Sequence, residues 1–185
     1  MPEQPRPQRK SPRLQGYDYS QEGAYFVTIC TYQRIHLFGD VVNGEMQFSD
    51  LGQIAHRLWA TISDHRSNVV LDGYVVMPNH MHGIIFINSQ QSSSQITVGM
   101  RRASSDVPLP QKLDNGARSR TLGTIIGAYK SVVTRTINRQ MGLRSPMIWQ
   151  NSFHDHIIRN EQALNHIREY VYTNPSRWAE DKFYS

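Results

Sequence analysis

The sequence has one cysteine and lacks any long apolar run. Cys30 alone cannot form an internal disulfide, and it cannot supply a zinc site built from several cysteines. No run of 18 apolar residues occurs, so no membrane span is expected, and the polar, proline-rich start does not resemble a signal peptide. We therefore expect a cytoplasmic protein that works in a reducing compartment and has no membrane partner.

A modest excess of basic residues is the main feature of the composition. There are 20 Lys and Arg against 15 Asp and Glu, a formal net charge of +5. A basic balance favours an anionic partner such as nucleic acid, although many proteins carry this charge without binding DNA. The excess excludes no function class by itself.

The chain is organised around one predicted domain. Residues 1–20 are rich in Pro, Arg and Lys and predict a disordered basic arm, either inert or lying along phosphates. Residues 21–185 fit a single domain. Within it, a stretch at about 88–118 is polar, of low complexity and basic, which predicts a mobile loop.

Hydrophobic periodicity predicts an α+β fold. Strands are expected at 25–31, 69–77, 80–87 and 147–158, a hairpin at 41–48 around Asn43-Gly44, and helices at 49–63, 121–142 and 161–172. Without the hairpin and the last helix, the order is βαββαβ, the ferredoxin-like arrangement. We expect an antiparallel sheet with helices on one face, plus the extra hairpin and C-terminal helix.

His80 and His82 form the sharpest local pattern, in the segment Met77-Pro78-Asn79-His80-Met81-His82-Gly83. Side chains alternate across a strand, so both imidazoles point to one face and can bind one divalent ion. Two such ligands leave room for waters and phosphate oxygens around Mg²⁺ or Mn²⁺. The alternative is a pair of polar residues at a strand end. A second such pair, His154 and His156, has a charged residue between its members.

Tyr129 lies in the middle of the apolar stripe of the longest predicted helix. If the histidine pair faces the helix layer, Tyr129 faces the same layer and its hydroxyl can approach a metal-bound phosphate. The alternative is a core residue, which is what a tyrosine in such a stripe more often is. Lys130 and Arg135 beside it are candidates for binding nucleic acid or for a solvated helix face.

Three segments, taken in order, carry a family likeness. YVVMPNHMHGII resembles the histidine–hydrophobic–histidine (HUH) motif of single-tyrosine transposases, and GTIIGAYKSVVTRTIN resembles their tyrosine-bearing helix. IWQNSFHDHIIRNEQALNHIREYVYTNP is similar to the C-terminal part of the REP-associated tyrosine transposases, a branch of that family. The likeness spans roughly residues 20–180.

The resemblance implies a metal-dependent endonuclease and strand transferase that acts on single-stranded DNA next to imperfect hairpins. It implies metal binding by His80 and His82, with Mg²⁺ or Mn²⁺ as cofactor. Tyr129 becomes the nucleophile that forms a 5′-phosphotyrosine bond and leaves a free 3′-hydroxyl. A bacterial-type, nucleoid-associated location follows from this partner.

One position departs from the family pattern. Related insertion-sequence enzymes have a metal-binding glutamine one turn after the tyrosine, where this chain has Val133. The third ligand is therefore open between water, DNA and another residue such as His156. A non-cleaving nucleic-acid-binding module and a non-covalent phosphodiesterase are the alternative functions. The apolar residues Met81, Ile85 and Ile87 need a cover, either the C-terminal helix or a second subunit of a homodimer.

Overall fold

The computed structural model describes residues 16–88, 121–142 and 147–184. The predicted arm at 1–20 lies outside these ranges up to position 15, and the predicted loop at about 88–118 lies outside them from position 89. Among the described helices, none combines the length and apolar character that crossing a bilayer requires.

The described chain has the predicted α+β order. The strands are β1 (Gly23–Cys30), β2 (Gly39–Val42), β3 (Glu45–Phe48), β4 (Val69–Met77), β5 (His80–Ile87) and β6 (His154–Ile158), and the helices are α1 (Asp50–Ala60), α2 (Leu122–Met141) and α3 (Glu161–Thr173). β4, β5, β1 and β6 form one sheet in that spatial order, with antiparallel neighbours. This order is that of a ferredoxin-like βαββαβ fold.

Local sequence signals set most of these boundaries. The hydroxyl oxygen of Ser49 accepts a hydrogen bond from the Gly52 N–H and so caps α1. Gly142 adopts a left-handed conformation, φ 64°, directly after α2. Asn43 and Gly44 have φ values of 54° and 79° in the β2–β3 turn, as the predicted hairpin requires.

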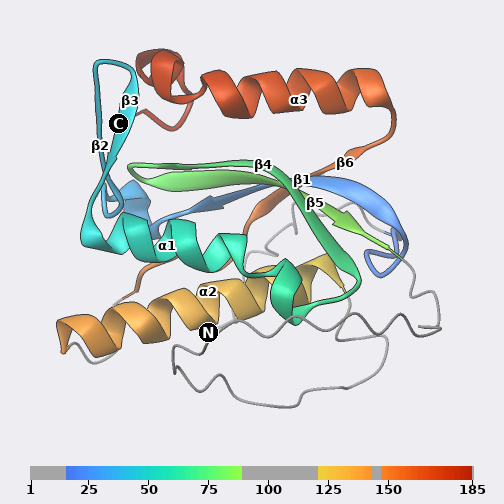
Figure 1. The fold of residues 1–185 in the computed structure, drawn as a ribbon, viewed down its shortest axis with the longest axis horizontal. Helices are drawn as coiled ribbons and strands as arrows, with labels where there is room; N and C mark the ends of the chain where they lie inside the picture. Colours follow the sequence, from blue (N-terminus) through green and yellow to red (C-terminus); the bar gives the residue numbers. More distant parts are fainter. Residues whose placement is uncertain (1–15, 89–120, 143–146, 185) are drawn as a thin grey trace, which may run out of the picture.

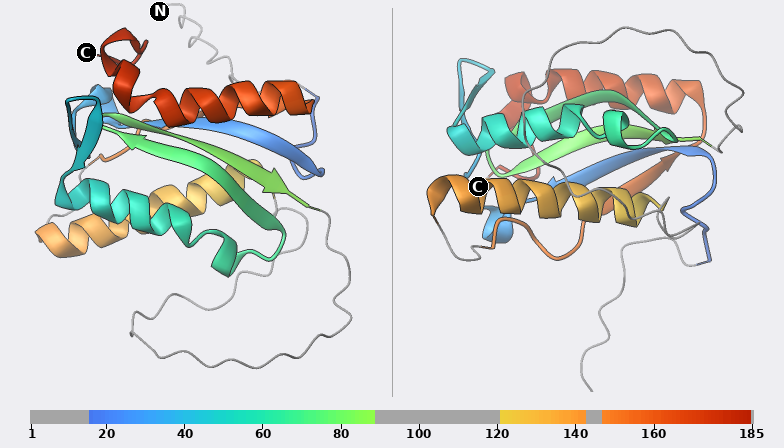
Figure 2. Two further views of the ribbon diagram at one scale, coloured as in Figure 1. Left: turned by 45° about the horizontal axis from the view of Figure 1, so that its top comes forward. Right: turned by 60° about the horizontal axis from the view of Figure 1, so that its bottom comes forward.

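Two layers of helix enclose the main sheet. α1 and α2 cover one face, as expected, whereas α3 lies across the other face (Figure 1). The rotated views show the same three-layer arrangement, with the sheet between α3 and the α1–α2 pair (Figure 2). The C-terminal helix is therefore a layer of its own.

Alternation along β5 divides its side chains between the two faces. Met81, Ile85 and Ile87 belong to the core formed with α1 and α2, whereas His82 contacts Tyr170 of α3. The sequence interpretation assigned these faces the wrong way round. Because every position of β5 is predominantly buried, periodicity gave no polar face from which to orient it.

The predicted strand at 147–158 is too long, because β6 begins only at His154. Before it, Trp149 and Phe153 are buried in the core of the α1–α2 side. The Lys130 ammonium group donates hydrogen bonds to the backbone carbonyls of Gln150 and Asn151. Residues 148–150 still form backbone hydrogen bonds with Cys30 and Tyr32 at the end of β1, so the predicted pairing begins there and is interrupted before β6.

Gly83 leaves room for the Trp59 indole of α1 to lie against the sheet. A Cβ atom at this position would overlap with the Trp59 indole at Cζ2. Trp59 is fully buried and rigidly packed, so it cannot move aside without disturbing the core. The glycine after His82 is thus a packing requirement.

We predict that Gly83→Ala lowers the free energy of unfolding by about 3 kcal/mol, since the added methyl group overpacks the core. Gly127→Ala is the matched control. Nothing lies within 4 Å of a Cβ built at Gly127 on α2, and replacing a helical glycine should raise stability by about 0.5–1 kcal/mol. Urea denaturation measures both. Equal effects of the two substitutions would contradict the packing role.

Candidate metal and tyrosine site

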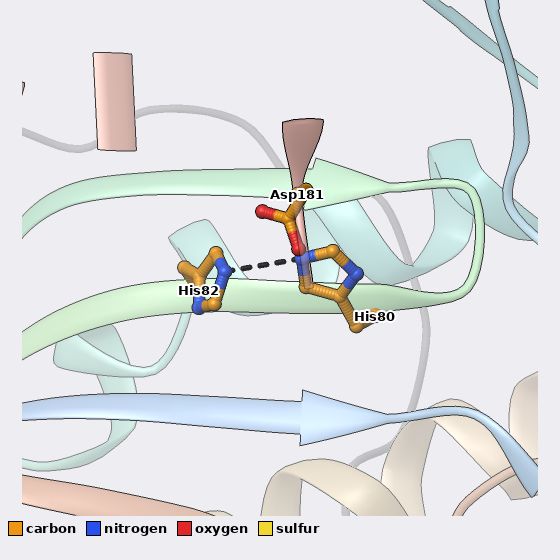
Figure 3. A group of neighbouring side chains, drawn as sticks. All are labelled: His80, His82 and Asp181. Carbon is orange, nitrogen blue, oxygen red and sulfur yellow. Dashed lines mark hydrogen bonds between the residues drawn. The ribbon is translucent and has the colours of Figure 1, made fainter. Parts of the chain in front are cut away.

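The site lies where β5 meets the C-terminal part of the chain. His80 and His82 point from β5 toward the α3 face, and the carboxylate of Asp181 lies against them (Figure 3). One ligand atom from each of these three residues lies within 4.8 Å of the other two. This group could hold a metal ion. The sequence interpretation named the two histidines but not Asp181.

The two imidazoles are oriented by hydrogen bonds on their Nδ1 atoms. His80 Nδ1 lies 2.9 Å from Asn79 Oδ1, and the Asn79 amide nitrogen in turn donates to the Phe183 carbonyl. His82 Nδ1 lies 2.8 Å from the Thr28 hydroxyl. With Nδ1–H donating to these oxygens, both Nε2 lone pairs are free to bind a cation.

The donor set fits a divalent ion. His80 Nε2 and His82 Nε2 are 3.0 Å apart, close to the roughly 3 Å expected for two ligands at right angles, each about 2.1 Å from one ion. A carboxylate oxygen from Asp181 completes a set of two imidazoles and one oxygen, which suits transition metals and Mg²⁺-like ions.

The protonation states also suit metal binding. Burial lowers the pKa of His80 to about 4, with Asp181 acting to raise it and Arg34 and Lys182 to lower it further. Burial, and then the neighbouring His80, lowers the pKa of His82. Both rings are therefore neutral at neutral pH, the state that ligates a cation.

Asp181 stays ionised in this partly buried place. Burial acts to raise its pKa, but the hydrogen bonds from the Phe183 N–H and the Asn174 amide outweigh it and leave the pKa below the ordinary value. The Phe183 N–H lies 2.7 Å from Oδ1, and the Asn174 amide nitrogen lies 2.7 Å from Oδ2.

Tyr170 is the tyrosine that the fold brings to this cluster. Its hydroxyl donates to Asp181 Oδ2 at 3.0 Å and lies 3.1 Å from His82 Nε2. Burial, and then the Asp181 charge, raises the pKa of this phenol. Tyr170 lies on the inner face of α3, held there by the buried Val171 and by an ion pair of Arg168 with Asp72 on β4.

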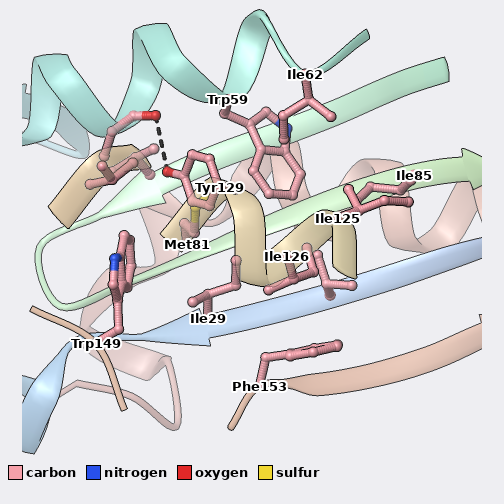
Figure 4. Packing of buried hydrophobic residues seen from close by; sticks show 14 of the residues in the cluster. Ile29, Trp59, Ile62, Met81, Ile85, Ile125, Ile126, Tyr129, Trp149 and Phe153 are labelled. Atoms are coloured by element: carbon pink, nitrogen blue, oxygen red, sulfur yellow. Dashed lines mark hydrogen bonds between the residues drawn. The ribbon is translucent and has the colours of Figure 1, made fainter. Parts of the chain in front are cut away.

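Tyr129, the predicted nucleophile, lies on the other side of the sheet. It is 4% exposed, its ring packs between Trp59 and Trp149, and its hydroxyl donates to the Ala55 carbonyl at 3.0 Å (Figure 4). Burial raises its pKa well above the ordinary value. The expectation that Tyr129 shares a face with His82 is therefore wrong, because it followed from the reversed orientation of β5.

The other predicted candidates also lie away from the cluster. The Lys130 ammonium group donates to the Gln150 carbonyl, and Arg135 is exposed. Both residues line an open pocket of about 540 Å³ between α2 and residues 147–151. Their predicted role in binding nucleic acid stays a prediction. His154 and His156 pair with β1 on its outer edge and are exposed, outside the metal-binding group of the described residues.

Asn174 is a further residue of the site that the sequence interpretation did not assign. It follows Tyr170 by one helical turn, the spacing at which the resemblance calls for a metal-binding amide. Its Oδ1 is buried and without a hydrogen-bond partner in the described structure. Counted from Tyr129, the same spacing falls on Val133, which has no polar side-chain atom.

A signal for Tyr170 was present in the sequence. Ile167, Tyr170, Val171 and Asn174 recur at helical spacing, so Tyr170 belongs to an inward stripe just as Tyr129 does. Periodicity alone cannot say which of two stripes faces the histidines. Asp181 had no comparable signal, because it follows the helix without any fixed spacing to β5.

Comparisons with known proteins agree with this architecture. An uncharacterized protein of Haemophilus influenzae is 37% identical over 177 residues, which is 95% of this chain and 93% of the relative. The solved structure of a REP-associated tyrosine transposase bound to a REP hairpin matches with a TM-score of 0.51 and 19% identity, over 92% of this chain and 77% of that one.

A candidate transposase of Deinococcus radiodurans matches with a TM-score of 0.41 and 16% identity, over 86% of this chain and 95% of that one. No protein-family model matches the chain.

We predict that the ion pair between Asp72 and Arg168 stabilises the protein in a pH-dependent way. Arg168 hydrogen bonding lowers the pKa of Asp72, so the stabilisation is present above about pH 4 and is lost as the pH falls through the folded-state value. Arg168→Met should cost about 1 kcal/mol at pH 7, since the pair is partly exposed. Urea denaturation at pH 7 and pH 3 measures this. An equal cost at both values would contradict the ion pair.

We also predict that Asp181→Asn weakens Mn²⁺ binding at least about tenfold, because it removes the one anionic ligand of the cluster. Isothermal titration of the metal-free protein measures the affinity. Glu180→Gln, a change of the same charge at an exposed neighbour, is the control and should bind Mn²⁺ as the wild type does. Unchanged affinity in Asp181→Asn would remove this carboxylate from the site.

Proposed function

Because this chain belongs to one family with the Haemophilus influenzae protein and has the fold of a REP-associated tyrosine transposase, we propose that it cuts and rejoins single-stranded DNA beside hairpins. The reaction is a metal-dependent phosphoryl transfer to a tyrosine. The observation that carries the proposal is the contact of the Tyr170 hydroxyl with both His82 and Asp181.

The nucleophile in this proposal is Tyr170, in place of Tyr129. A nucleophile must reach the phosphorus that the metal polarises, and Tyr170 is the tyrosine beside the metal-binding group. Tyr170 is partly exposed, so a phosphodiester can approach it from outside the fold. Tyr129 is enclosed by two indole rings and bonded to a backbone carbonyl.

His80, His82 and Asp181 would hold the cation, with the Asn174 amide as a further ligand. An Mg²⁺ or Mn²⁺ ion held there would supply Lewis acidity toward the scissile phosphate and the phenol. Asn174 Oδ1 suits the role of a metal ligand because it is a buried acceptor without a hydrogen-bond partner among the described residues. Asn79 and Thr28 keep the two imidazoles in the ligating tautomer.

The chemical step transfers one phosphoryl group without an external energy source. The Tyr170 hydroxyl, positioned by its hydrogen bond to Asp181 Oδ2, releases its proton to solvent. The phenolate oxygen then bonds to phosphorus, and the bond from phosphorus to the 3′-oxygen breaks. The 3′-oxygen leaves with a proton from solvent as a free hydroxyl. Attack by another 3′-hydroxyl reverses the step and rejoins the strand.

We predict that Tyr170→Phe abolishes covalent attachment to a labelled single strand that carries a hairpin from the repeats beside its own gene, with Mn²⁺ present. Tyr129→Phe should still form the adduct and lose about 1 kcal/mol of stability, since it removes only the hydrogen bond to Ala55. Tyr172→Phe, a change on the exposed side of α3, should behave as the wild type. A denaturing gel reads the adduct as a slow-migrating band.

The same gel separates the alternatives. An adduct that still forms in Tyr170→Phe but is lost in Tyr129→Phe would show that the nucleophile is Tyr129 and would contradict the proposal. Cleavage without any adduct would indicate a non-covalent phosphodiesterase. Hairpin binding without cleavage would indicate a nucleic-acid-binding module.

A further inference from the structure

We propose that Arg34 and Lys182 form a phosphate-binding site at the edge of the His80–His82–Asp181 group. The ligand is a backbone phosphate of single-stranded DNA next to the scissile bond. The identity of this anion rests on the proposed function; the presence of an anion site rests on the geometry of the two cations.

Both cations lie against one aromatic ring that covers the site. The Arg34 guanidinium carbon is 5.1 Å and the Lys182 ammonium nitrogen is 4.9 Å from the centroid of the Phe183 ring. That ring lies 4.5 Å from the His80 ring and 5.8 Å from the His82 ring, between centroids. The two positive charges are therefore held beside the metal ligands, from loops far apart in the sequence.

Neither cation is neutralised within the described structure. The ion pairs among residues 16–88, 121–142 and 147–184 include neither Arg34 nor Lys182. The adjacent Asp181 carboxylate accepts hydrogen bonds from Tyr170, Asn174 and a backbone N–H instead. The Arg34 guanidinium donates to the Lys182 backbone carbonyl at 3.4 Å, so the two residues are neighbours. An anion bound by both side chains would offset their like charges.

The backbone around Arg34 is held in an uncommon conformation. Gln33 and Arg34 have φ values of 53° and 57°, both in the left-handed region that few residues other than glycine adopt. The buried Thr31 hydroxyl donates to the Ile35 and Asn79 carbonyls and ties this turn to the loop that carries His80. A strained turn anchored to the metal site is typical of a functional position.

The chemistry of this pair suits a phosphodiester. Arg34 and Lys182 are both exposed. Their side chains would contact the backbone phosphates of a DNA strand that binds next to Tyr170. The guanidinium offers parallel N–H donors to two phosphate oxygens, while the ammonium group supplies a compact charge. These contacts carry no sequence information and would fix the position of the strand.

The test measures the binding of a fluorescein-labelled 20-nucleotide thymidine strand without metal, in the Tyr170→Phe background, so that no cleavage interferes. Fluorescence anisotropy gives the affinity over a series of NaCl concentrations. Arg34→Asn with Lys182→Gln should weaken binding and make the slope of log affinity against log salt shallower by about 1.4, for two lost contacts to a single strand. Asparagine is chosen because it tolerates the left-handed conformation.

Arg57→Gln with Arg139→Gln is the matched control, since it removes two exposed charges from α1 and α2 on the other face of the sheet. Its slope should match that of the parent. The charge-conserving change Lys182→Arg should keep both affinity and slope, and each single neutral variant should lose about half of the effect. The thermal unfolding midpoint of each variant establishes that it is folded.

An unchanged salt slope in the folded Arg34→Asn/Lys182→Gln variant, or an equal change in the control, would overturn the phosphate site. This outcome is separate from the fate of the proposed reaction. If no adduct ever forms through Tyr170 but the salt slope depends on Arg34 and Lys182, the anion site stands and the cleavage proposal fails.

Discussion

The alternation of side chains along β5 is the constraint on which the rest of the site depends. Odd-numbered positions fill the core with α1 and α2, and Gly83 among them admits the Trp59 indole. His80 and His82 are thereby committed to the opposite face. A shift of one residue in register would bury the imidazoles among aliphatic side chains and separate both of them from Asp181.

The sequence predicted the elements well and their mutual orientation poorly. Capping residues, the Asn43-Gly44 turn and helical stripes are local signals, so α1, α2, α3 and the hairpin were expected within a few residues of their true bounds. The orientation of β5 depends on which helices pack against each of its faces, and its almost entirely buried residues do not show this locally. The expectation that Tyr129 shares a face with the histidines followed from that one ambiguity, whereas the histidine pair itself needed only the period of a strand.

The chemistry and the packing of the C-terminal part are inseparable. One short stretch supplies Tyr170, Asn174, Asp181 and Lys182, while Phe183 closes over both imidazoles. The sheet side contributes only the histidines and the groups that orient them, Thr28 and Asn79. The metal-binding group, Tyr170 and the two cations thus lie together because α3 lies across the sheet, where the Asp72–Arg168 ion pair and Val171 fix its position.

The distance along the chain between the two halves of the site has a consequence for biosynthesis. His82 and Tyr170 are 88 residues apart in sequence, and domains fold as the ribosome releases them from the N-terminal end. A nascent chain that ends after β5 therefore contains His80 and His82 but lacks Tyr170 and Asp181. The proposed cleavage would therefore require α3 and Asp181, both of which are synthesised after β5.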